Sequence, residues 1–112
     1  MEIPQPNQRH PVVDKFVTQM NQLLPQDLDT RSTMVQVEAV GSMVTFNCKL
    51  HCPLEEQDFG NFIREMKPEI VQGLANSPIT PILREHNLIL RYAYCDDQFR
   101  NKISITLFPG EY

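Results

Sequence analysis

Two pairs of alternating apolar runs constrain the fold of this chain more than any other feature of its sequence. The first pair has its apolar positions at Val35, Val37 and Ala39, then at Val44, Phe46, Cys48 and Leu50. The second pair has them at Leu88, Leu90, Tyr92 and Tyr94, then at Ile103, Ile105 and Leu107. Apolar residues at every second position predict half-buried strands. Gly41-Ser42 suits a tight turn and Asp96–Asn101 a longer loop, so we expect two antiparallel hairpins.

A helical pattern precedes the first hairpin. Its apolar residues follow the spacing of one helix stripe and are Val13, Phe16, Val17, Met20, Leu23 and Leu24. Pro11 suits the first turn of this helix, because its missing N–H falls among the unpaired donors there. Pro25 is predicted to end it near Leu24, since a proline disfavours helical geometry in the preceding residue. Residues 26–32 then form a polar connection.

A second helical pattern lies between the hairpins, with apolar residues at Phe59, Phe62, Ile63, Met66, Ile70 and Leu74. The acidic residues Glu55, Glu56 and Asp58 precede it and suit a helix start. Pro68 predicts a kink or a break near Lys67. A short helix is expected over residues 81–86, with Thr80 as its N-cap and Asn87 as its left-handed stop.

These elements predict an α+β fold in the order α-β-β-α-(α)-β-β. Helices packed on one face of a four-stranded antiparallel sheet bury all the apolar stripes economically. The chain has 112 residues, which is the length of a single domain. We therefore expect one domain over residues 12–112. Residues 1–11 hold three of the nine prolines and are predicted to be a flexible arm.

Composition excludes some classes of function. The net charge is −4 and the lysines and arginines are scattered, whereas a nucleic-acid-binding protein usually carries a basic stripe. We therefore expect no nucleic-acid partner. No run approaches the roughly 20 apolar residues of a membrane span, so the domain is expected to be soluble. Residues 1–11 lack the hydrophobic region of a signal peptide. Either the chain is cytoplasmic, or Met1 replaces a removed export signal.

The three cysteines, Cys48, Cys52 and Cys95, do not form a complete disulfide framework, because their number is odd. A bridge between Cys48 and Cys52 is disfavoured on one extended strand, which would separate them by about 13 Å. A disulfide between Cys95 and either Cys48 or Cys52 remains an alternative. Buried thiols are the simplest interpretation. A zinc site with His51 is the alternative, although His51 would point away from both neighbouring cysteines on a strand.

No complete catalytic set is visible. Cys52 or Cys95 with His51 or His86 would make a nucleophile and base, but the flanking residues do not resemble an activating turn. The acidic residues at Asp96-Asp97 and before the second helix are ordinary for a loop and for a helix start. No glycine-rich phosphate loop or His-Glu-x-x-His helix is present. We therefore predict that the chain is not an enzyme and needs no cofactor.

Phe99 and Arg100 are the predicted interaction site. Tyr92 and Tyr94 share a strand face with Leu88 and Leu90, so we expect them in the core. Phe99 instead lies in the middle of a polar loop, where an aromatic side chain has no obvious core to enter. It either covers the open end of the sheet or contacts a partner, because aromatic residues are enriched at interfaces.

Two segments carry a resemblance to a known group of proteins. The run Asn21-Gln22-Leu23-Leu24-Pro25 followed by Asp29-Thr30 resembles an N-x-x-L-P motif with a following Asp and Thr. Leu90-Arg91-Tyr92-Ala93-Tyr94 before Asp96-Asp97 resembles a Y-x-Y-x-D strand. Together they are similar to small exported bacterial domains of the quorum-sensing-regulator-like type, over roughly residues 13–108. The cysteines of that group near Ser77 and at Phe108-Pro109-Gly110 are missing here, so its disulfide would be missing as well.

The resemblance implies a periplasmic or exported protein without known enzymatic residues. We therefore expect a small non-enzymatic domain of the bacterial cell envelope that binds a protein partner or itself. An uncovered sheet face or an edge strand is the expected contact surface. The alternative is a domain that binds a small ligand or a metal at a cysteine-bearing interface between helix and sheet.

Overall fold

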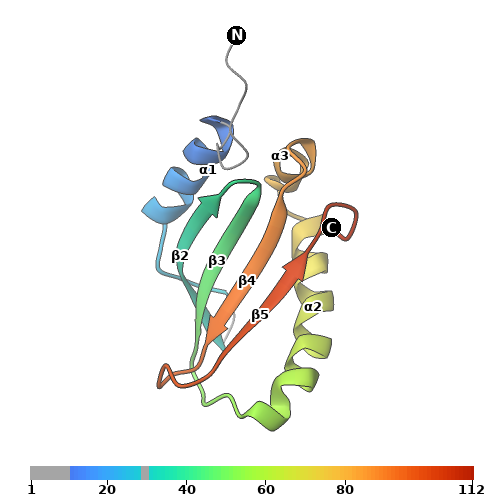
Figure 1. Ribbon diagram of the computed structural model, residues 1–112. Coiled ribbons are helices and arrows are strands. Elements are labelled where there is room, and N and C mark those ends of the chain that lie inside the picture. The colour runs from blue at the N-terminus through green and yellow to red at the C-terminus, as the bar shows by residue number, and fades with distance from the viewer. Residues whose placement is uncertain (1–10, 29–30) are drawn as a thin grey trace.

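The computed structural model describes residues 11–28 and 31–112 (Figure 1). The predicted flexible arm therefore lies outside the described residues, except for Pro11. The elements in order are α1 (Pro11–Gln22), β1 (Gln26–Asp27), β2 (Ser32–Val40), β3 (Met43–Leu50), the 3₁₀ turn η1 (Glu56–Asp58), α2 (Phe59–Ala75), α3 (Thr80–Glu85), β4 (Ile89–Cys95) and β5 (Lys102–Leu107). Both predicted hairpins are confirmed, and Gly41 adopts a φ of 59° in the turn of the first.

The sheet is mixed, so the predicted antiparallel sheet is wrong. The described residues form five strands in the order β1-β2-β3-β4-β5, and β3 pairs with β4 in parallel. The reason lies in the connection. Helix α2 runs back along the sheet after β3, so β4 starts at the end where β3 started (Figure 1). Two strands joined by such a crossover run in the same direction.

Two details of the first half of the chain also differ from the prediction. The polar connection contains β1, whose Gln26 and Asp27 pair with Met34 and Thr33 of β2. The register of β2 then shifts between Met34 and Gln36. This irregularity turns Val35 outward, where its side chain is 46% exposed, and places Met34 with Val37 and Ala39 in the core. A bulge adds one residue and breaks strict alternation.

The helices follow the sequence prediction with three corrections. Helix α2 continues through Pro68, so the predicted break near Lys67 does not occur. Pro68 and Arg64, the residue whose carbonyl lacks its helical N–H partner, are both exposed. Thr80 is the first residue of α3 rather than its N-cap, and its hydroxyl donates to the carbonyl of Leu74 at 2.5 Å. Leu23 is exposed beyond the end of α1. The left-handed stop at Asn87 is confirmed by a φ of 51°.

Helices α1 and α2 pack on one face of the sheet, which we call the inner face. Its buried side chains come from all four long strands, and with the helix residues Val13, Phe16, Met66 and Leu74 they form the core. The opposite face, which we call the open face, carries the alternate residues of the same strands. No helix of the described residues has the length and hydropathy needed to cross a membrane.

Two side chains fasten the ends of the core to backbone groups. The Asn21 amide donates to the carbonyl of Val37 at 2.8 Å and accepts from its N–H at 2.9 Å, which ties α1 to β2. The Tyr112 hydroxyl donates to the carbonyl oxygens of Leu83 and Leu88, which holds the last residues against α3. Backbone groups satisfied in this way do not carry the cost of burial without a partner.

Candidate functional site

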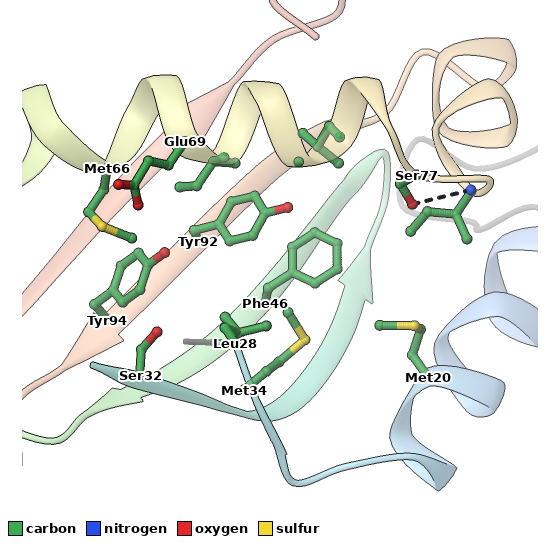
Figure 2. Close-up of a pocket in the computed structure, with 14 residues that line it drawn as sticks. Met20, Leu28, Ser32, Met34, Phe46, Met66, Glu69, Ser77, Tyr92 and Tyr94 are labelled. Carbon is green, nitrogen blue, oxygen red and sulfur yellow. Dashed lines mark hydrogen bonds between the residues drawn. The ribbon is translucent and has the colours of Figure 1, made fainter. Parts of the chain in front are cut away.

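A groove of about 410 Å³ lies over the inner face between α1 and α2 (Figure 2). Three methionines line it, one from α1 (Met20), one from β2 (Met34) and one from α2 (Met66). The aromatic rings of Phe46 and Tyr92 form part of its floor. Methionine is unbranched and polarisable, so a groove with three of them adapts to differently shaped apolar partners.

Aromatic contacts pack the floor of the groove. Phe46 and Tyr92 are paired across the parallel strands, and their rings stack with centroids 4.7 Å apart. Tyr94 makes an edge-to-face contact with Phe62 of α2 at 5.0 Å. Burial, with a smaller contribution from Cys48, raises the pKa of the Tyr92 hydroxyl above its ordinary value. The predicted place of both tyrosines in the core is confirmed.

Polar groups lie at the rim. Arg31, which precedes β2, has its Nη2 atom 3.2 Å from Glu69 Oε2 on α2 and 3.3 Å from Met66 Sδ. Both charged side chains are about half exposed, so this ion pair contributes little to stability, about 0–1 kcal/mol. At the other end the Ser77 hydroxyl accepts from the N–H of Ile79 at 3.4 Å. No cysteine, histidine or lysine is among the described residues that line the groove.

The structure does not bring the three cysteines together. Cys48 is buried on the inner face, Cys52 is exposed, and Cys95 lies on the open face between Lys49 and Lys102 in the strand register. None of the three forms a disulfide. Within residues 11–28 and 31–112, no three His, Cys, Asp or Glu side chains are grouped so that they could hold a metal ion. Of the three cysteines, only Cys48 lies on the helix-covered side, so the expected cysteine-bearing interface is not formed.

The histidine of the zinc or thiol site considered from the sequence has a different neighbour. His51 Nε2 lies 2.6 Å from the hydroxyl of Thr33, which donates to Asp27 Oδ1 at 2.7 Å. The hydroxyl occupies the centre of this chain of hydrogen bonds. In a catalytic triad the histidine occupies the centre, so that it can take the proton of the nucleophile. The hydrogen bonds of Asp27, Thr33 and His51 therefore join the ends of β1, β2 and β3 and do not have the order of a catalytic triad.

Phe99 and Arg100, the predicted interaction site, lie in the loop between β4 and β5, and both are exposed. The Phe99 side chain is 65% exposed, its φ is 58°, and Lys49 Nζ lies 5.1 Å from the ring centroid. The Asp96 side chain shapes the loop by accepting the N–H groups of Gln98 and Arg100. Burial opposes the charge on Asp96, but backbone hydrogen bonds outweigh it and hold the pKa of this carboxyl below its ordinary value.

Comparison with known proteins defines the class of fold. No protein-family model matches the sequence, and no curated protein matches it. Solved structures do match. They show that the chain shares its α+β fold with several bacterial proteins.

Three such structures are similar over most of both chains. A protein of Pseudomonas aeruginosa described as secreted has a TM-score of 0.74 at 10% identity, covering 89% of this chain and 88% of the other. The pilotin EpsS of the Vibrio vulnificus type 2 secretion system has a TM-score of 0.70 at 8% identity, covering 89% and 87%. The type II secretion system pilotin AspS of Vibrio cholerae has a TM-score of 0.68 at 10% identity, covering 90% and 89%.

Sequence reasoning missed the groove as a site. Its signal was present in part, because Met20 and Met66 lie on the apolar stripes of two helices. Met34 was not assigned to the inner face, since strict alternation places Val35 there. The groove emerges only when the bulge and the position of α2 over the inner face of the sheet are known.

Proposed function

We propose that this chain is a non-enzymatic protein-binding domain of the bacterial cell envelope, and that its groove holds an apolar helical segment of a partner protein. The observation that carries the proposal is the methionine-lined groove over a floor that includes the stacked rings of Phe46 and Tyr92. The fold shared with pilotins and with a protein described as secreted supports the compartment. The resemblance of the sequence to quorum-sensing-regulator-like domains, which implies the same compartment, is a further part of this proposal.

The floor of the groove indicates a helix rather than a strand as occupant. Its side chains come from β2, β3 and β4, whose backbone groups are paired with neighbouring strands. A partner lying on them finds side chains and no free strand edge. An α-helix satisfies its own backbone hydrogen bonds, so it can present apolar residues at i, i+3, i+4 and i+7 to the groove.

A matched pair of substitutions tests the proposal. Met20→Glu puts a charge at the groove, whereas Met43→Glu puts the same charge on a half-buried methionine outside it. We expect a leucine-rich amphipathic peptide to bind the unsubstituted protein in fluorescence anisotropy. Met20→Glu should weaken binding about tenfold or more, which corresponds to about 1.4 kcal/mol, and Met43→Glu should not. Equal effects, or no binding by the unsubstituted protein, would refute the groove as the site.

Three further measurements address compartment, self-association and the alternative function. In the bacterium of origin, we expect fractionation to find the protein in the cell envelope, and a purely cytoplasmic protein would contradict that part. Sedimentation shows whether the groove is filled by a second copy, since Met20→Glu would then abolish a dimer. Saturable binding of a small apolar ligand, with no peptide binding, would favour the small-ligand alternative, because the volume of the groove suits one.

A further inference from the structure

A second pocket lies on the open face of the sheet, away from the groove. Its volume is about 460 Å³, and the residues on which the argument depends are Lys49 of β3, Arg91 of β4, Lys102 and Ser104 of β5, and Phe99 of the loop. No aspartate or glutamate is among the described residues that line it. The chain as a whole carries a net charge of −4, so the local positive charge of this pocket is opposite in sign to the charge of the whole chain.

The strand register explains why the cations gather there. Lys49, Cys95 and Lys102 are paired partners across three adjacent strands, so their side chains share the open face. Arg91 lies on the same face four residues before Cys95. The acidic side chain in the row of Arg91 is Glu38, which lies two strands away, at about 10 Å, and accepts from the Asn47 amide at 3.3 Å.

Arg91 has an unused donor in the pocket. Its Nε atom is buried and has no hydrogen-bond partner among the described residues. A buried donor without a partner is unfavourable, more so in a charged group, and it is normally satisfied by water or by a ligand. Arg31, at the rim of the groove, instead has Glu69 as its partner.

Phe99 supplies an apolar neighbour to these charges. The loop holds the ring outward through its positive φ and through the hydrogen bonds to Asp96, and Lys49 lies over the ring. An exposed aromatic ring among cations suits a ligand that combines carboxylates with apolar side chains. Aromatic residues and arginine are enriched where proteins bind one another.

We infer that the pocket on the open face binds an acidic segment of a partner polypeptide, with carboxylates at Lys49, Arg91 and Lys102 and an apolar side chain on Phe99. The cations come from three adjacent strands, and the strands of Lys49 and Lys102 lie about 10 Å apart. Successive acidic residues of an extended peptide reach both strands. The site lies on the face opposite the groove, so it does not depend on the proposed function.

Amide NMR of the isotopically labelled protein tests this inference. The probe is a short peptide of glutamates with a central phenylalanine, and the control is the same peptide with glutamine in place of glutamate. We expect the acidic peptide to shift the amide signals of β4, β5 and residues 96–101, and the control to leave them unchanged. Binding should weaken as salt is raised, because exposed charges are screened. Shifts confined to α1 and α2, or equal shifts by the control, would overturn the inference.

Two other probes separate the sources of negative charge. Inorganic phosphate and vesicles of phosphatidylglycerol are added to the same protein. If either binds as tightly as the acidic peptide at the same residues, the assignment to a polypeptide is wrong. Weak or absent binding of both, with binding of the peptide, supports it.

Matched substitutions locate the site. Arg91→Gln should weaken binding of the acidic peptide about tenfold, and Lys102→Gln, which changes an exposed side chain and spares the fold, should weaken it severalfold. Lys15→Gln removes the same charge from an exposed position of α1 and should have no effect. Phe99→Ser should weaken the phenylalanine-containing peptide more than one with alanine in its place. Equal effects of Lys15→Gln and Lys102→Gln would mean that net charge alone drives binding, which would overturn the assignment of the site.

Discussion

The inner and open faces of the sheet are built by the same strands and have opposite chemistry. On β3, Phe46 points into the core and stacks on Tyr92, whereas its neighbour Asn47 points to the open face and donates a hydrogen bond to Glu38. The inner face is apolar and carries helices, and the open face is polar and carries a cluster of cations. One sheet thus presents two surfaces of different chemistry, and alternation along the strands keeps them separate.

The largest effect should come from truncating one of two neighbours on β3. Phe46→Ala should destabilise the protein by about 3–5 kcal/mol, because it removes a buried ring and leaves a cavity under the groove. Asn47→Ala should change stability by less than about 0.5 kcal/mol, as surface substitutions usually do. Urea unfolding of the two variants measures the difference. Similar losses would contradict the assignment of the two faces.

A smaller effect is expected where α1 is tied to the sheet. Asn21→Ala removes the two hydrogen bonds to the backbone of Val37 and should cost about 1–3 kcal/mol. Asn21→Asp keeps the acceptor and loses the donor, so it should cost less. Hydrogen exchange at the Val37 amide gives a direct readout, since its protection should fall in the alanine variant. Unchanged protection would mean that Asn21 does not hold this side of the groove.

The C-terminal residues contribute less. Tyr112→Phe keeps the buried ring and removes the hydroxyl that donates to the carbonyls of Leu83 and Leu88, so stability should fall by about 1 kcal/mol. Thermal unfolding measures the loss. Tyr94→Phe is the matched variant on the floor of the groove, because it removes a hydroxyl from a different part of the core. An unchanged melting temperature in Tyr112→Phe would contradict the role of its hydroxyl in holding the last residues against α3.

The smallest effect should depend on pH. The folded-state pKa of Asp96 lies below its ordinary value of 3.8, so its ionised form stabilises the protein above that value. The contribution is lost as pH falls through the folded-state pKa. Asp96→Asn should therefore be less stable than the unsubstituted protein at neutral pH, and the difference should shrink below about pH 4. Urea unfolding at both pH values measures it. A difference that grows in acid would contradict the role of Asp96 in holding the loop of Phe99.

The sequence allowed the local elements to be predicted and left their assembly open. Alternation located both hairpins, and Gly41 and Asn87 marked a turn and a helix end. The parallel pairing of β3 with β4 depends on the path of α2, which periodicity does not contain. The outward turn of Val35 comes from a bulge that strict alternation cannot anticipate.

The candidate sites divide in the same way. Phe99 was found because an aromatic residue in a polar loop is unusual, but its cationic neighbours come from three strands whose order only the structure gives. The groove likewise could not be predicted without the strand order. The three cysteines have similar chemistry, and the fold nevertheless places Cys48 and Cys95 on opposite faces.

Methyl NMR on methionine-labelled protein tests the central claim most directly, namely that the groove is a binding surface. Met20, Met34 and Met66 line the groove, and Met43 lies outside it as an internal reference. On addition of the amphipathic helical peptide, the methyl signals of the three groove methionines should shift together along one binding curve while Met43 stays unchanged. A shift of Met43 alone, or no shift of the groove methionines at saturating peptide, would contradict the account.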